Sequence, residues 1–296
     1  MAERAHMTAD LIGMSNANPL TRRTFMNSAA AAAAGYTLAA GPVCADTIKT
    51  GTSGIDVATE KIKVVAGDMP VYVARPQTVK NPPVVLVAME VFGLHEYIKD
   101  VARRLAKLGA LAMAPDYYFK QGDLSQFTDI GKLMPLVNSK PDDELVAGLD
   151  SCVAWAGKNG GDAKRVGIVG FCRGGRTVWV YCARSAAPKA GVAFYGSLAD
   201  PPAQKAVWPK SPIELAPEMK APVLGLYGGA DQGITADQIE TMKKALKAAG
   251  KTAEFKIYPD APHGFHADYR PSYRQAPAEE AWAQMQTWFK THGVLA

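Results

Sequence analysis

Short apolar runs alternate with amphipathic stretches along most of the chain. Continuous apolar runs are typical of strands buried on both faces of a sheet. Such strands are expected at residues 83–89, 110–115, 165–171, 191–195, 222–227 and 253–258. Amphipathic segments between them predict helices at residues 95–108, 142–157, 174–186, 236–249 and 278–290. This alternation predicts an α/β fold, with a mostly parallel central sheet and helices on both faces.

Two segments fall outside this alternation. Residues 60–65 and 69–74 predict an opening β-hairpin that turns at Gly67-Asp68. Residues 116–140 are polar and irregular, with a short helix expected at 124–136, which suits an excursion that caps the sheet. No repeat or long low-complexity linker interrupts residues 46–296, so we expect them to form a single domain.

The first 45 residues differ in character from the rest. The pair Arg22 and Arg23 precedes an alanine-rich apolar run at 28–40, and Val-Cys-Ala at 43–45 forms a small-residue site. A positive segment, a short apolar run and such a site are typical of a secretory signal peptide, and the arginine pair favours the twin-arginine route. We expect residues 1–45 to be a twin-arginine signal peptide, read by the export machinery, and the mature protein to be periplasmic or secreted in a bacterium. A buried alanine-rich helix is the alternative.

Composition and charge exclude several classes of protein. Hydrophobic residues make up 48% of the 296 positions and charged residues 21%, as in an ordinary globular protein. The formal net charge is +5 without a run of basic residues, which argues against nucleic-acid binding. The apolar run near the N-terminus is too short to span a bilayer, so stable membrane insertion is not expected. The sequence leaves the oligomeric state open.

Residues 170–174 read Gly-Phe-Cys-Arg-Gly and lie between an expected strand and an expected helix. The G-x-S-x-G nucleophile elbow of α/β-hydrolases occupies this context, and here Cys172 takes the place of the serine. The helix dipole at this position favours a thiolate. The backbone N–H of Arg173 is expected to be one donor of an oxyanion hole. A buried, inert cysteine in a plain turn is the alternative.

The other two cysteines of the expected mature chain, Cys152 and Cys182, fall within expected helices and are predicted to be packing residues. They could also pair with each other. An odd number of thiols in an oxidising compartment leaves at least one of the three unpaired within the chain.

A thiol nucleophile needs a base and a group that orients the base. In α/β-hydrolases these follow the nucleophile in chain order. Asp231 follows the strand at 222–227, and His263 follows the last strand. Both lie where loops at the carboxyl ends of strands build sites. Asp260 is a less suitable acid because it lies so close to His263 in sequence.

The remaining histidines have simpler explanations. His266 forms an H-x-x-H pair with His263, but two histidines without a third ligand are a weak indication of a metal, and none is expected. His95 and His292 fall on expected helices, where solvated faces account for them.

Further segments match a known family together with the elbow. They are Met-Glu-Val-Phe-Gly at 89–93, Ala-Pro-Asp-Tyr-Tyr at 114–118, Asp231, and Pro-His-Gly-Phe at 262–265. From about residue 60 to the C-terminus, the chain resembles the dienelactone hydrolase (carboxymethylenebutenolidase) family. The resemblance implies an α/β-hydrolase fold and a carboxylic ester hydrolase that uses no cofactor.

The resemblance also implies roles for residues after the first buried strand. The glutamate matching Glu90 holds the resting thiol and then deprotonates it when substrate displaces the carboxylate. The residue matching Val91 supplies a second oxyanion-hole N–H. An acid at the end of an apolar strand is costly unless it serves a partner, which agrees with a role for Glu90. A rim carboxylate in an ion pair is the alternative.

The chain departs from the family at the substrate carboxylate. Two arginines grip that group in dienelactone hydrolases. Lys120 lies where the first of these arginines is expected, and a lysine cannot reproduce the bidentate grip of a guanidinium. Ala267 lies where the second is expected, and Arg270 follows three residues later. The side chain of Arg173 could supply the charge or form a surface ion pair. Lys120, Arg173 and Arg270 are therefore the candidates for substrate binding.

We accordingly expect hydrolysis of a small ester or enol-lactone through Cys172, His263 and Asp231, with an acyl-thiol intermediate. The alternatives are a broad carboxylesterase or acyl transferase, and a non-catalytic periplasmic binding protein with the same fold.

Overall fold

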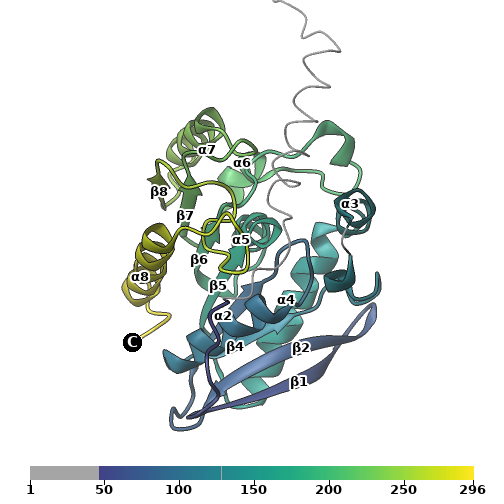
Figure 1. Ribbon diagram of the computed structural model, residues 1–296, viewed down its shortest axis with the longest axis vertical. Helices are drawn as coiled ribbons and strands as arrows, with labels where there is room; N and C mark the ends of the chain where they lie inside the picture. Colours follow the sequence, from purple (N-terminus) through teal and green to yellow (C-terminus); the bar gives the residue numbers. More distant parts are fainter. Residues whose placement is uncertain (1–46, 128) are drawn as a thin grey trace, which may run out of the picture.

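The computed structural model describes residues 47–127 and 129–296 (Figure 1). The expected signal peptide therefore lies outside the described residues. Within them, eight strands form one sheet in the order β1-β2-β4-β3-β5-β6-β7-β8. The strands are β1 Ile55–Val64, β2 Gly67–Pro76, β3 Pro83–Ala88, β4 Leu111–Pro115, β5 Asp162–Phe171, β6 Pro188–Phe194, β7 Val223–Gly228 and β8 Ala253–Tyr258. The pairs β1/β2 and β2/β4 are antiparallel and the other neighbours are parallel, so the mostly parallel sheet is confirmed.

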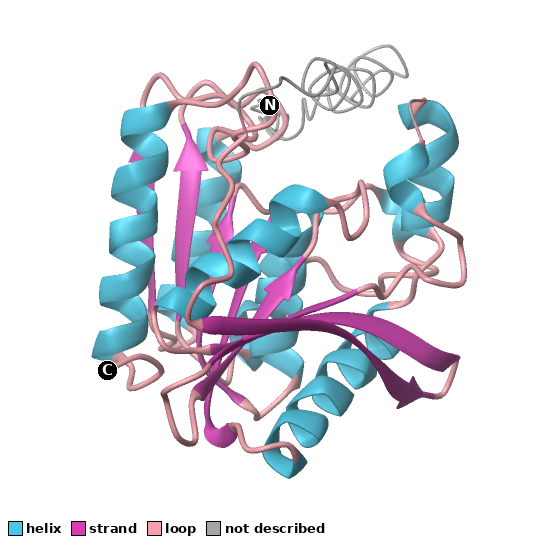
Figure 2. Ribbon diagram, turned by 60° about the horizontal axis from the view of Figure 1, so that its bottom comes forward, coloured by secondary structure: helices cyan, strands magenta, loops and turns pink. Residues whose placement is uncertain are grey.

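Helices cover both faces of the sheet (Figure 2). Side chains of successive strand residues point to opposite faces, and Gly191 is paired with the residue after Gly167. A Cβ on Gly167 would meet Phe289 and Val294 of the C-terminal region, whereas one on Gly191 would meet Val178 of α5. These two regions therefore lie on opposite faces, which confirms the predicted layers. The α-helices are α2 Glu96–Lys107, α3 Ile130–Asn138, α4 Asp142–Lys158, α5 Arg173–Arg184, α6 Pro212–Leu215, α7 Ala236–Ala248 and α8 Gln275–Thr291.

Two segments differ from the sequence prediction. The strands of the hairpin are longer than expected. The chain turns at residues 65–66 instead of at Gly67-Asp68, because Gly67, with a φ of 128°, already belongs to β2. The helix expected at 124–136 is divided into a 3-10 turn, Leu124–Gln126, and α3. The carboxylate of Asp129 accepts the N–H of Gly131 and so starts α3 as a new helix.

The carboxyl ends of the parallel strands meet at one edge of the sheet. The turn that carries Cys172 follows β5, the segment that carries Glu90 follows β3, and the loops that carry Asp231 and His263 follow β7 and β8. The topology therefore brings residues that are far apart in sequence to the edge where open α/β sheets bind ligands.

Candidate active site

Cys172 stands on a strained turn between β5 and α5. Its φ is 55° and its ψ is −114°, a region that costs a non-glycine residue about 1–3 kcal/mol. Its N–H donates to the carbonyl of Phe194 at 3.0 Å. A Cβ on Gly174 would lie 2.0 Å from the carbonyl oxygen of Ala88, so glycine is required for α5 to start against the end of β3. This is the backbone geometry of a nucleophile elbow, and it places the thiol at the N-terminus of α5.

His263 and Asp231 meet beside this turn. Nδ1 of His263 lies 2.7 Å from Oδ2 of Asp231. The other oxygen of Asp231 accepts the N–H groups of Gly233 at 2.8 Å and Ile234 at 3.3 Å, which fixes the carboxylate. Burial lowers the pKa of His263, but Asp231 and Cys172 outweigh it and raise that pKa to about 10. The three side chains therefore form one electrostatic unit in which the imidazolium is favoured.

Glu90 is fully buried after β3, beside groups from two other loops. Its Oε2 accepts the hydroxyl of Tyr269 at 2.6 Å and lies 3.3 Å from Nε2 of His95. Burial raises the pKa of Glu90, but Arg270, His95 and Tyr269 more than offset this and bring it to about 2. Glu90 is therefore ionised at neutral pH, and its Oε1 has no hydrogen-bond partner among the described residues.

Arg270 is a buried cation in the same cluster. Its guanidinium carbon lies 4.4 Å from the centroid of the Phe92 ring and 4.9 Å from that of Tyr269. Its Nε and Nη2 have no hydrogen-bond partner among the described residues. Glu90 first, then Tyr269 and Cys172, raise the pKa of Arg270 against the effect of burial. Two buried donors without a hydrogen-bond partner among the described residues therefore lie in the Glu90 cluster.

The other two candidates for substrate binding lie elsewhere. The side chain of Arg173 is buried, with Nη2 3.8 Å from Oδ1 of Asp142 and its guanidinium 3.8 Å from the centroid of Trp208, so it does not form the surface pair that we considered. Lys120 is exposed next to Gly67 at the start of β2, with its Nζ 5.4 Å from the centroid of the Phe119 ring. Among the three cations, the structure thus brings Arg270 into the Glu90 cluster.

The expectation for His95 is wrong. It was placed on a solvated helix face, but it is the N-cap residue of α2, and its side chain is only 15% exposed against Glu90. The N–H of His95 donates to the carbonyl of Gly93, whose φ of 76° turns the chain just before the helix. This turn directs the side chain towards the site instead of towards solvent.

Cys152 and Cys182 are free and buried, as is Cys172, so the described cysteines form no disulfide. Asp260, the alternative acid, is exposed. His292 caps the end of α8 and packs edge-on against Trp288, with 4.2 Å between ring centroids.

Comparison with known proteins identifies the family of this fold and site. The model of the "Dienelactone hydrolase family" matches residues 69–293. The chain belongs to the dienelactone hydrolase family.

Close relatives cover nearly the whole chain. A protein of Methylorubrum extorquens AM1 named "Putative carboxymethylenebutenolidase" is 48% identical over 97% of this chain and 98% of its own length. A protein of the same name from Escherichia coli K12 is 45% identical over 88% of this chain and 96% of its own length. A crystal structure titled "Putative Dienelactone Hydrolase" from Klebsiella pneumoniae is 45% identical, covers 80% of this chain and 98% of that one, and has a TM-score of 0.77. The protein is thus a hydrolase with the α/β-hydrolase fold, similar to carboxylic ester hydrolases.

No group of three or more potential metal ligands occurs among the residues that the structure describes. His266, which the sequence pairs with His263 as H-x-x-H, is instead joined to the hydroxyl of Tyr97 by a 2.7 Å hydrogen bond through Nδ1. Nor does any helix in the described ranges have the length and apolar character needed to cross a membrane.

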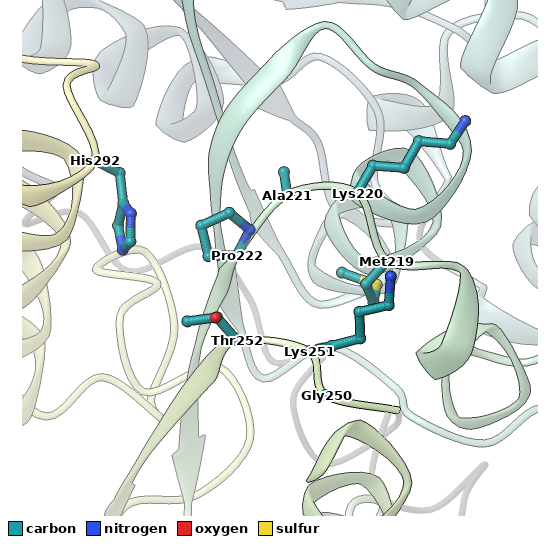
Figure 3. A pocket seen from close by; sticks show the side chains of 8 residues that line it. All are labelled: Met219, Lys220, Ala221, Pro222, Gly250, Lys251, Thr252 and His292. Carbon is teal, nitrogen blue, oxygen red and sulfur yellow. The ribbon is translucent and has the colours of Figure 1, made fainter. Parts of the chain in front are cut away.

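A hollow of about 400 Å³ lies at the edge of the sheet where β7 and β8 begin, opposite the edge that carries Cys172. His292 faces Pro222 across it (Figure 3). Its lining residues are Met219, Lys220, Ala221, Pro222, Gly250, Lys251, Thr252 and His292. In this member of the dienelactone hydrolase family, Cys172, Glu90, Asp231 and His263 all follow the carboxyl ends of strands, so the hollow lies apart from them.

Acid should destabilise the protein through His266. Burial and the nearby Arg104 lower the pKa of His266 from 6.5 to about 3, although Glu90 acts in the other direction. As pH falls below 6.5, the unfolded chain takes up a proton at this position before the folded one does. The free energy of unfolding should therefore fall by up to about 1.4 kcal/mol per pH unit between pH 6.5 and 3.

Urea unfolding at several pH values measures this slope. His266→Gln should give a shallower slope than the wild type, and His292→Gln should keep the wild-type slope. Equal slopes for wild type and His266→Gln would contradict the assignment of the pH effect to His266.

Proposed function

We propose that this protein hydrolyses a small ester or enol-lactone through a covalent acyl-thiol intermediate on Cys172. The observation that carries the proposal is the strained elbow of Cys172 next to the His263–Asp231 pair, with Cys172 and Asp231 together raising the pKa of His263. A thiol, a base and an acid that orients the base are the parts needed for nucleophilic acyl transfer.

The reaction would proceed in two halves. The thiolate of Cys172 attacks the carbonyl carbon, and the oxyanion accepts hydrogen bonds from the backbone N–H groups of Arg173 and Val91. The tetrahedral species expels the alkoxide or enolate, which takes its proton from His263. His263 then removes a proton from water, which attacks the thioester. The acid product leaves and the thiolate is restored.

We propose that Glu90 accepts the proton of Cys172 when the resting thiol is neutral. A carboxylate with a pKa of about 2 is a weak base. For Glu90 to accept the proton, one of the contacts that lower its pKa must first be broken. Arg270 is the strongest of those contacts. A substrate anion that binds the uncommitted donors of Arg270 would draw the guanidinium away from Glu90 and make the carboxylate more basic. Substrate binding would then activate the nucleophile.

Arg270→Gln should therefore reduce the preference for anionic substrates. Loss of a buried charged hydrogen bond costs about 1.5–3 kcal/mol, so we expect the ratio of kcat/KM between a carboxylate-bearing enol-lactone and a neutral aryl ester to fall about 10–100-fold. Arg274→Gln on the same loop is the matched control, since Arg274 is exposed and its side chain donates to the backbone carbonyls of Pro271 and Tyr273. An unchanged ratio in Arg270→Gln would mean that the substrate anion binds elsewhere.

Intact-mass spectrometry tests the proposed function directly. Brief mixing with an aryl ester or enol-lactone should add one acyl group to the wild type and none to Cys172→Ala. Turnover without dependence on Cys172 would overturn the proposal. Binding without any adduct or turnover would favour the non-catalytic binding protein, and transfer of the acyl group to an added alcohol in preference to water would favour an acyl transferase.

We also propose that the protein is exported by the twin-arginine route and acts in the periplasm or outside the cell. The paired Arg22 and Arg23 before an alanine-rich run support this proposal. Fractionation of cells that express the full chain, with Arg22 and Arg23 both changed to lysine as the comparison, tests it. The substituted protein should stay in the cytoplasm.

A further inference from the structure

His95 is fixed in place by the chain around it. It precedes α2 in extended backbone geometry, with a φ of −88° and a ψ of 177°. Its ring stacks on Tyr97, with 5.9 Å between centroids, and meets Tyr269 edge-on at 4.9 Å and Phe92 edge-on at 6.5 Å. Aromatic contacts on several sides hold the imidazole in one orientation. A histidine on the predicted solvated helix face would have none of these restraints.

The imidazole is directed at one oxygen of Glu90. Oε2 of Glu90 receives the Tyr269 hydroxyl at 2.6 Å and faces Nε2 of His95 at 3.3 Å. Oε1 is buried and has no hydrogen-bond partner among the described residues. The two groups that face Oε2 come from different loops, His95 from the one before α2 and Tyr269 from the one after β8. Together they fix the plane of the carboxylate and leave Oε1 as the oxygen that can accept a proton.

The charged and titratable groups facing His95 come from three elements. Glu90 lies after β3, Tyr97 lies on α2, and Tyr269 and Arg270 lie in the loop between β8 and α8. Beyond Tyr97 lies His266, hydrogen-bonded to its hydroxyl. Glu90 supplies the negative charge in this group. Glu90 is therefore the carboxylate that His95 contacts.

We infer that His95 is a positioning residue that, with Tyr269, holds Oε2 of Glu90 so that Oε1 is available to take the proton of Cys172. The inference rests on the proposed function, in which Glu90 accepts that proton. Nε2 of His95, 3.3 Å from Oε2, and the hydroxyl of Tyr269, 2.6 Å from the same oxygen, together keep the carboxylate oriented.

Two substitutions separate orientation from charge. His95→Ala removes the donor, and kcat should fall about 10–100-fold with KM changed less than 3-fold. The side-chain amide of His95→Gln can still donate an N–H to Oε2, so it should restore kcat to within about 5-fold of the wild type. His292→Ala, far from the site, is the matched control and should leave kcat unchanged.

The remaining outcomes are also decisive. A His95→Ala protein with wild-type kcat would overturn the inference. It would also be overturned if His95→Gln were as slow as His95→Ala while both variants melt at the wild-type temperature. If Cys172→Ala kept its turnover, the proposed function itself would fail. Loss of turnover in Cys172→Ala together with normal His95 variants would overturn only the role of His95.

Discussion

Replacing Cys172 with alanine should lower kcat/KM for an ester or enol-lactone by about 10⁴-fold or more. Without the sulfur no acyl-enzyme can form, and His263 and the oxyanion donors alone can only assist slow attack by water. Cys172→Ser should also lose most of the activity, because a hydroxyl needs a stronger base than a thiol and the site lies next to an imidazolium-favouring pair. Steady-state kinetics with one carboxylate-bearing lactone and one neutral aryl ester measures both effects.

Cys152→Ala is the control for the Cys172 variants. The Cys152 side chain is buried in α4, so its loss should reduce stability slightly and leave kcat/KM unchanged. Activity of Cys172→Ser close to that of the wild type would instead indicate a serine-hydrolase-like esterase that tolerates cysteine.

Replacing Arg176 with methionine should lower the free energy of unfolding by about 3–5 kcal/mol. Arg176 is buried and binds two carboxylates at once. Its Nη1 and Nη2 donate to Asp142 at 2.7 and 3.0 Å, and its Nε and Nη2 donate to Asp200 at 2.7 and 2.5 Å. Both aspartates are also buried, with 2% side-chain exposure each, so removing the guanidinium leaves negative charge without adequate compensation.

Urea unfolding at neutral pH measures the loss. Lys205→Met is the matched control, because Lys205 pairs with Glu214 at the surface, where an ion pair is worth about 1 kcal/mol or less. A change in Arg176→Met no larger than that in Lys205→Met would show that Asp142 and Asp200 are accommodated without Arg176. The change should act on stability, since the Arg176 network is separate from the His263–Asp231 pair.

The strands, the layers and the elbow could be predicted because each depends on a local pattern. The apolar run of β3 predicts a buried strand wherever it lies in the chain, and the glycines around Cys172 specify a tight turn by themselves. Asp231 and His263 were predicted from their places after strands, and the structure brings them within 2.7 Å of each other. In these cases sequence order and strand position already determine proximity.

His95 and Tyr269 could not be predicted in this way. The hydrogen bond from Tyr269 to Glu90 joins residues 179 positions apart and depends on the path of the last loop. The direction of the His95 side chain depends on the turn at Gly93, and the spacing of apolar residues does not predict that turn. Burial of Arg173 under Trp208 likewise depends on where the loop after β6 folds. A useful signal was nevertheless present, since both His95 and Tyr269 lie within a few residues of segments that matched the family.

Cys152 and Cys182 are free thiols buried in helices, which allows a thiol reagent to distinguish them from Cys172. Burial raises the pKa of Cys152 and of Cys182 well above the ordinary value, so at neutral pH both stay protonated and shielded from alkylating reagents. Once residues 1–45, which carry the fourth cysteine, Cys44, are removed, we expect Cys172 to be the thiol that reacts. The number of equivalents of reagent consumed in a stoichiometric alkylation of that shortened chain should then equal the number of molecules with an intact Cys172. Rates can then be expressed per working site, so that losses of activity by oxidation are separated from slow catalysis.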